Sequence, residues 1–305
     1  MILGVDIGGT SVKMGLIDES GKIHVQTEAS VCFDGYQTPI IDTVCKEAKH
    51  FLAAQNAQVE GIGVSATGQI DSHTGVVIGT NGKIPHYEGI PIKERLENAL
   101  GVPAWVLNDA NAAALGECFI GRARGRKNVI MLTLGTGVGG GLVLNGRLYD
   151  GQRGIAGELG HFTLYQDGIP CTCGKRGCFE SYASTTALLA RVRKVYPEEP
   201  EWNGRLVFER AAQGDAVLRD ILSAWIDDIA AGITGLVHIF NPEMVIIGGG
   251  VSRQEALLMQ PLRERVLFHV MPRFAEELQI EPALLGNDAG MIGAVKFFME
   301  KDCAN

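Results

Sequence analysis

One histidine and three cysteines lie within eighteen positions of one another, in the segment GELGHFTLYQDGIPCTCGKRGCFE (residues 157–180). They are His161, Cys171, Cys173 and Cys178. A neutral imidazole and three thiolates are the donor set of structural Zn²⁺ sites, which are tetrahedral and closed to a catalytic water. The spacing Cys-x-Cys-x₄-Cys differs from the paired Cys-x₂-Cys of zinc ribbons, and three buried or redox-active cysteines are the alternative. We predict a structural zinc site.

Two glycine-rich turns, at residues 8–10 (Gly-Gly-Thr) and 135–137 (Gly-Thr-Gly), each separate two strand-like apolar runs. Glycine lets a turn approach a phosphate closely and point its N–H groups at it, and the threonines offer hydroxyl donors. The second turn matches G-x-G-x-x-G, but a strand-like run follows where a Rossmann site needs a helix, and the chain has no G-x-x-x-x-G-K-[ST] motif. We predict phosphate binding of another kind, with plain tight hairpins as the alternative.

A third glycine run, at residues 248–250, ends a strand-like segment before a helix-like one, which suits the base or ribose of a nucleotide. Asp6 stands at the end of the strand-like run before the first turn. A carboxylate beside a phosphate turn can hold hydrated Mg²⁺, and capping of the turn is the alternative.

Asn108 and Asp109 stand where the strand-like run PAWVLN (residues 103–108) passes directly into the helix-like run DANAAALGECF (residues 109–119). The carboxyl edge of a sheet exposes such side chains, and α/β proteins bind ligands there. We therefore expect this pair in a binding cleft, although Asp109 is also suited to cap the helix.

The secondary-structure elements that must position these groups occur twice in the same order. Strand, glycine turn and strand occur at residues 2–17 and again at 129–148, and a third strand extends the first pair into an antiparallel meander. This weak internal repeat predicts two related lobes. Helices are expected near residues 37–56 and 91–100 and, in the second half, at 184–196, 216–240 and 291–300.

The bulk composition narrows the class of protein. A length of 305 residues predicts two domains, and a formal charge of −8 argues against a nucleic-acid surface, so the basic run at residues 122–127 is expected to be a solvated loop. Seven cysteines, four of them scattered, predict reduced thiols in a cytoplasmic protein. No signal peptide and no apolar run of eighteen residues is found, so we expect no membrane partner.

The order of the motifs resembles the ROK family of sugar kinases and repressors over essentially the whole chain. The motifs are DIGGT, NDANAAALGE, LGTGVGGG, GELGH, CTCGKRGCFE and VIIGGG. The resemblance implies an α/β fold of two ribonuclease-H-like (actin-like ATPase) lobes, with mixed sheets flanked by helices and the active site in the cleft between them. We expect a small lobe at residues 1–110 plus about 292–305, and a large lobe with the zinc-binding loop at residues 111–291.

The resemblance also assigns roles by position. Asp109 matches the family's catalytic base. The expected sugar contacts are Asn108, Asp109, Glu158, His161 and Glu180. The expected nucleotide and Mg²⁺ contacts are Asp6, Gly8, Gly9, Thr10, Lys13, Gly135, Thr136, Gly137, Gly248, Gly249 and Gly250. The expected zinc ligands are His161, Cys171, Cys173 and Cys178, so one ring nitrogen of the histidine could bind metal while the other meets a sugar hydroxyl.

The implied activity is ATP-dependent transfer of the γ-phosphoryl group to the 6-hydroxyl of a glucose-like sugar, by a homodimer or homotetramer with ATP, Mg²⁺ and structural Zn²⁺. The segment NGKIPHYEG (residues 81–89) lacks the tryptophan that the family's glucokinases commonly carry in this loop. N-acetylmannosamine kinase and beta-glucoside kinase are therefore alternatives, and a non-catalytic sugar sensor is a further one. A repressor of this family would need a helix-turn-helix before the first strand, which here begins at residue 2.

Overall fold

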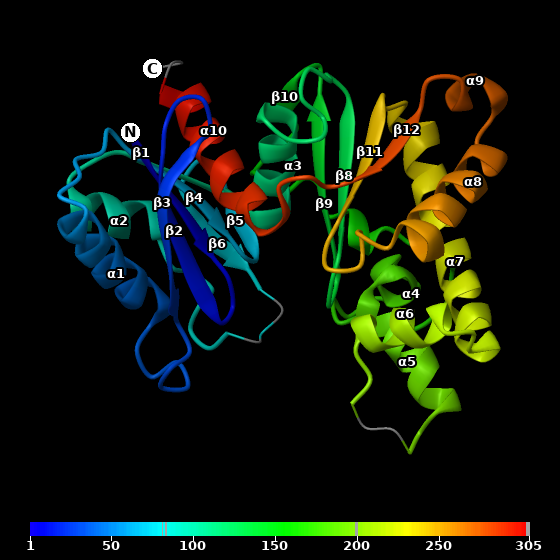
Figure 1. Cartoon of the computed structure of the whole chain (residues 1–305). Coiled ribbons are helices and arrows are strands. Elements are labelled where there is room, and N and C mark those ends of the chain that lie inside the picture. Colours follow the sequence, from blue (N-terminus) through cyan, green and yellow to red (C-terminus); the bar gives the residue numbers. More distant parts are fainter. Residues whose placement is uncertain (81, 83, 199–200, 303–305) are drawn as a thin grey trace.

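The computed structural model describes residues 1–80, 82, 84–198 and 201–302, and its framework is two five-stranded sheets (Figure 1). In spatial order, the first sheet contains β3 (Ile23–Ser30), β2 (Ser11–Ile17), β1 (Ile2–Ile7), β4 (Ile62–Ala66) and β7 (Ala104–Asn108). The second contains β10 (Arg147–Leu148), β9 (Val138–Leu144), β8 (Val129–Leu134), β11 (Met244–Gly248) and β12 (Gln279–Pro282).

The two sheets have the same topology. In each, three successive strands form an antiparallel meander, one later strand pairs in parallel with the first of them, and the last strand pairs in parallel with that later strand. The internal repeat inferred from the strand–glycine turn–strand segments is confirmed, as is the mixed character of both sheets. Each sheet packs on its own hydrophobic core, because its central strands are buried along nearly their whole length.

Helices α3 (Asp109–Phe119) and α10 (Ala289–Asp302) lie between the two sheets (Figure 1). Helix α3 packs on β8 and β9, α10 packs on β1, β4 and β7, and the two helices pack against each other. Their close crossing depends on glycine: a Cβ on Gly293 would lie 1.7 Å from the carbonyl oxygen of Ala112, and one on Gly116 would lie 2.3 Å from that of Ala289. Helix α10 thus returns the end of the chain to the first sheet.

The remaining helices cover the outer faces. Helices α1 (Ile40–Ala54) and α2 (Ile92–Leu100) flank the first sheet, and α2 ends at Gly101 with a φ of 73°, the left-handed C-terminal cap expected of glycine. The second sheet is accompanied by α4 (Glu180–Ala183), α5 (Thr185–Val195), α6 (Gly204–Ala212), α7 (Ala216–Phe240), α8 (Gln260–His269) and α9 (Pro272–Ala275).

Helix α7 is long and apolar enough to span a membrane by length and composition, and in the described part of the chain it is the one helix of that kind. Half of its most apolar window is buried inside the protein, and Leu222, Trp225 and Ile229 lie in the core of the second sheet. Its apolar residues are therefore explained by packing against α4, α5, α6 and α8.

A two-stranded hairpin, β5 (Gln69–Asp71) and β6 (Val76–Gly79), was not expected from the sequence. Its strands are too short to show an alternating pattern. The hairpin follows β4 and places its first residues beside the junction of β7 and α3, where the cavity described next is found.

Candidate active site

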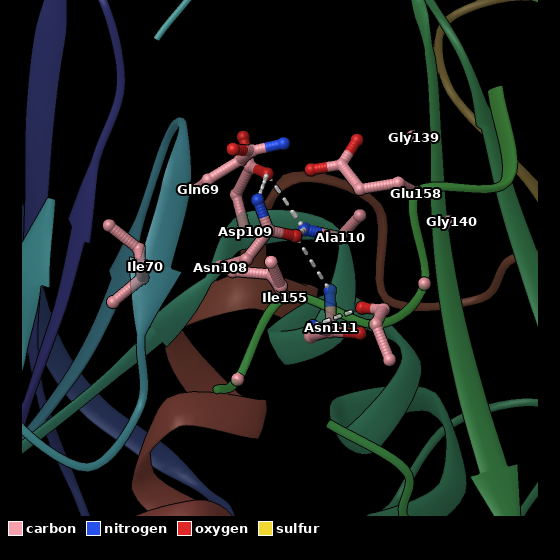
Figure 2. A pocket seen from close by; sticks show the side chains of 13 residues that line it. Gln69, Ile70, Asn108, Asp109, Ala110, Asn111, Gly139, Gly140, Ile155 and Glu158 are labelled. Atoms are coloured by element: carbon pink, nitrogen blue, oxygen red, sulfur yellow. Dashed lines mark hydrogen bonds between the residues drawn. The ribbon is translucent and has the colours of Figure 1, made fainter. Parts of the chain in front are cut away.

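A cavity lies between the first sheet, the start of α3 and strand β9 (Figure 2). The lining residues are Gln69, Ile70, Asn108, Asp109, Ala110, Asn111, Gly139, Gly140, Gly154, Ile155, Ala156, Gly157 and Glu158. The cavity therefore collects side chains from both halves of the chain.

Asn108 caps helix α3 and sets the direction of its neighbour. Its side-chain oxygen accepts hydrogen bonds from the backbone N–H groups of Ala110 and Asn111, which ends β7 and starts the helix. Its Nδ2 donates to the carbonyl of Gly68 at 2.8 Å and to Asp109 Oδ1 at 3.0 Å. The sequence offered Asp109 as a possible cap, whereas the structure shows that Asn108 fills this position and that Asp109 lines the cavity.

Burial raises the pKa of Asp109 from 3.8 to about 6, and the negative charges of Asp6 and Glu158 add to that rise. The hydrogen bonds from Ala110 and Asn108 work in the opposite direction, because they favour the ionised form. The carboxylate is therefore mostly ionised at neutral pH, yet its proton affinity is much higher than that of an exposed aspartate. This is the property required of a general base.

Glu158 lies across the cavity from Asp109, and the two carboxylates point toward each other (Figure 2). It follows Gly157, whose φ of 95° is in a region that side chains rarely adopt, and a Cβ at Gly157 would lie 2.9 Å from Asn111 Oδ1. The short helix η1 (Leu159–His161) then brings His161 Nε2 to 3.9 Å from Glu158 Oε2. Glycine at position 157 thus allows the turn that aims Glu158 into the cavity.

The four predicted metal ligands converge. The ligand atoms of His161, Cys171, Cys173 and Cys178 all lie within 4.8 Å of one another. His161 Nδ1 is 3.6 Å from Cys171 Sγ, and Cys173 Sγ is 3.6 Å from Cys178 Sγ. Ligand atoms of tetrahedral Zn²⁺ lie roughly 3.3–3.8 Å apart, so this donor set fits the ion. The histidine directs Nδ1 to the cluster and Nε2 to Glu158.

The first glycine turn is a tight hairpin between β1 and β2. The N–H of Gly8 donates to the carbonyl of Ser11, and the hydroxyl of Tyr36 donates to the carbonyl of Gly9. Asp6, opposite Lys13 in the strand register, accepts a hydrogen bond from Ser65 Oγ at 2.6 Å, while burial raises its pKa. Thr10 is exposed at the tip of the turn.

The second and third glycine turns lie against each other. A Cβ on Gly249, whose φ is 94°, would lie 2.2 Å from the carbonyl oxygen of Leu134, the residue before Gly135. Cβ atoms on Gly135 and Gly250 would meet nothing within 4 Å, so there is open space beside both turns. This arrangement can accept a phosphate and an attached nucleoside, as the sequence suggested for residues 135–137 and 248–250.

Two predicted sugar contacts lie outside the cavity wall. His161 reaches it only through Glu158, and the carboxylate of Glu180 accepts a hydrogen bond from the N–H of Val138 at 2.9 Å, next to the second glycine turn. Their contact with a sugar stays a prediction.

Several lining residues were missed by sequence reasoning, above all Gln69, Ile70, Asn111 and Ile155. Asn111 is 2% exposed, and its Nδ2 donates to the carbonyl of Ala156, while Oδ1 has no partner among the described residues. Asn111 lies two residues after Asp109, in the first turn of the same helix, and this position could have identified it as a residue of the site. The other three carry no pattern of their own.

The fold and site define a class: a two-lobed α/β protein of the actin-like ATPase kind, with paired glycine turns and a polar cavity between related sheets, as expected from the sequence. A sequence profile of the ROK family matches residues 2–301. The chain therefore belongs to the ROK family.

Relatives of known structure and activity agree with this assignment. The chain is 35% identical to a glucokinase of Thermotoga maritima, covering 98% of both chains, and 33% identical to a beta-glucoside kinase of Listeria monocytogenes, covering 99% of this chain and 98% of the relative. The structure is similar to that of a ROK family glucokinase from Streptomyces griseus in complex with glucose and AMPPNP, with a TM-score of 0.81, 33% identity and coverage of 97% and 98%.

Proposed function

We propose that the protein is an ATP-dependent sugar kinase that transfers the γ-phosphoryl group to a hydroxyl of a glucose-like hexose. The observation that carries this proposal is Asp109, a carboxylate with a raised pKa on the wall of a cavity between the two related sheets. The glucokinase relatives and the glucose- and AMPPNP-bound structure support the same activity.

The cavity wall suits a ligand rich in hydroxyl groups. Asp109 and Glu158 supply carboxylate oxygens, and Asn111 supplies a buried carbonyl oxygen without a donor. Such a wall demands donors from the ligand and rejects analogues that lack them. In the reaction, Asp109 accepts the proton of the attacking hydroxyl, while Asn108 and Glu158 orient the sugar.

The nucleotide is assigned to the glycine turns. The open space beside Gly135 and Gly250 supports contacts with phosphates and nucleoside, and residues 8–10 with Lys13 are the proposed phosphate contacts from the first sheet. Asp6 is the proposed partner of a hydrated Mg²⁺, which supplies charge neutralisation to the phosphates when bound. Its pKa, raised by burial, is expected to fall in the presence of a cation.

Zinc has a structural role in this proposal. The cluster of His161, Cys171, Cys173 and Cys178 holds residues 161–178 in one arrangement, and His161 passes that order to Glu158 through Nε2. Zn²⁺ supplies a closed tetrahedral crosslink there when bound and no catalytic chemistry.

The family resemblance also supports proposals for the lobe boundary, the acceptor hydroxyl, the oligomeric state, the location and the sugar. The lobes divide near residue 110, and α10 belongs to the small lobe because it packs on β1, β4 and β7. Transfer to the 6-hydroxyl, a homodimer or homotetramer and a cytoplasmic location follow from the resemblance. Glucose is the proposed substrate, with N-acetylmannosamine and beta-glucosides as alternatives. These alternatives were suggested by the sequence of residues 81–89, of which Asn81 and Lys83 lie outside the described residues.

The decisive experiment measures ADP release with Mg-ATP across glucose, N-acetylglucosamine, N-acetylmannosamine, mannose, fructose, allose and cellobiose. A clear preference for one sugar, lost in Asp109→Asn, supports the kinase and names the substrate. No turnover on any of them, with sugar binding still measurable by calorimetry, would favour the non-catalytic sensor and refute the kinase.

A further inference from the structure

The second glycine turn is fastened by one short segment of chain, residues 180–186. The N–H of Thr185 donates to the carbonyl of Gly135 at 2.8 Å, and the hydroxyl of Thr186 donates to the carbonyl of Thr136 at 2.7 Å. Glu180 Oε2 accepts the N–H of Val138 at 2.9 Å. Hydrogen bonds from residues 180–186 therefore hold Gly135, Thr136 and Val138.

Glycine at position 137 permits the approach of this carboxylate. A Cβ there would lie 2.3 Å from Glu180 Oε2, closer than a real contact allows. Because an ionised carboxylate binds a backbone N–H more strongly than a neutral oxygen does, this contact is the strongest of the three. It determines where β9 begins and therefore the shape of residues 135–137.

The same segment continues directly from the zinc cluster. Cys178 lies two residues before Glu180, and Glu180 Oε1 lies 3.4 Å from the hydroxyl of Thr172 and 4.0 Å from Cys171 Sγ. One carboxylate thus contacts the cysteine loop through one oxygen and the glycine turn through the other. This side chain therefore links the two segments directly.

We propose that Glu180 is a positioning residue for the nucleotide-binding glycine turn, and that the zinc cluster, by fixing the loop against Glu180, sets the affinity for ATP. This inference rests on the proposed function, because it assigns a nucleotide to residues 135–137. It is separate from the predicted sugar contact of Glu180, because it concerns the hydrogen bond to Val138 and is tested without sugar. The coupling also explains why a metal cluster with no catalytic position lies beside a phosphate turn.

The test is the affinity for a non-hydrolysable ATP analogue with Mg²⁺, measured by calorimetry on the zinc-loaded full chain without sugar. Glu180→Ala is expected to weaken nucleotide binding about tenfold, because it frees the N–H of Val138. Glu180→Gln keeps an acceptor and should restore most of the affinity. The matched control is Glu158→Ala, which removes the carboxylate that does face the cavity: its sugar affinity should fall while its nucleotide affinity stays at the wild-type value.

Amide hydrogen exchange at Val138 gives a readout independent of turnover. Exchange should accelerate in Glu180→Ala and, to a similar extent, in wild-type protein stripped of zinc, if the loop acts through Glu180. Should Glu180→Ala fail to fold, Gly137→Ala displaces the same carboxylate with a single methyl group and should weaken nucleotide binding in the same way.

Two failures can be told apart. If wild type binds no nucleotide, the proposed function and this inference both fall. If wild type binds nucleotide while Glu180→Ala, or Gly137→Ala in its place, binds it equally well, this inference is wrong and the kinase proposal stands. Unchanged exchange at Val138 after zinc removal would overturn the metal's part in the coupling.

Discussion

Replacing Asp109 by asparagine should abolish turnover and at the same time stabilise the folded protein. Asparagine keeps an oxygen that can accept the hydrogen bonds now made by the N–H of Ala110 and by Asn108 Nδ2, so the start of α3 should be preserved. What it removes is a charge that burial and the neighbouring carboxylates of Asp6 and Glu158 disfavour.

The size of the effect follows from the pKa. The folded pKa of about 6 is above the value of 3.8 for a free side chain, so the folded protein binds more protons than the unfolded chain between those pH values. Stability from this group is therefore lost as pH rises through that window, by about 3 kcal/mol for a shift of about two units. The pKa of about 6 already includes the favourable hydrogen bonds from Ala110 and Asn108, so the expected gain in unfolding free energy above pH 7 is the full value of about 3 kcal/mol.

The assay is denaturant unfolding of wild type and Asp109→Asn at pH 7.5 and at pH 4.5, with ADP release measured at pH 7.5. The gap in unfolding free energy should be about 3 kcal/mol at the higher pH and should shrink to about 1 kcal/mol at the lower, while turnover falls by about 10²–10⁴-fold. Asp220→Asn, at an exposed position on α7, is the control and should change neither quantity.

Two results would refute the reasoning. Turnover above a few per cent of wild type would remove Asp109 from the role of base. A stability gap that is absent at pH 7.5, or equal at both pH values, would show that the buried charge is not the destabilising feature.

Three other changes have expected outcomes. The value of kcat/KM for the preferred sugar should fall about tenfold per pH unit below about pH 6, where protonated Asp109 cannot accept a proton, and a flat profile down to pH 5 would contradict this. Chelation of zinc or Cys173→Ala should lower activity about tenfold or more and weaken sugar binding, as measured by ADP release and calorimetry; unchanged values would remove the supporting role of the metal. Gly249→Ala should destabilise the fold by about 3 kcal/mol in denaturant unfolding, because the φ of this residue is 94° and the added Cβ would meet the carbonyl of Leu134. Gly250→Ala is the matched variant: its Cβ would lie in open space, so stability should be unchanged while nucleotide binding weakens.

Much of the site could be predicted because its components are local in the sequence. The proposed zinc ligands occupy one eighteen-residue stretch, so their convergence needs only a compact loop. The glycine turns can be recognised from their runs of glycine. The junction at Asn108 and Asp109 can be recognised because a short apolar run is followed directly by a run of helix-forming residues. The repeated strand order predicted two related lobes, and the two sheets of the structure have the same topology.

What the sequence could not show depends on segments distant in the chain. Gln69 and Ile70 line the cavity only because a short unpredicted hairpin lies beside α3. The raised pKa of Asp109 requires burial together with Asp6 and Glu158, which are about a hundred and about fifty positions away.

Glu180 shows the same limit most clearly. The sequence by itself determined which groups the protein has for chemistry: a cluster of one histidine and three cysteines, glycine-rich turns and a carboxylate at a strand end. Only the tertiary structure decided that the carboxylate of Glu180 accepts a hydrogen bond from the N–H of Val138. The direction of a side chain and the electrostatic cost of its burial are set by the packing of neighbours from other elements, and no local pattern of residues encodes that packing.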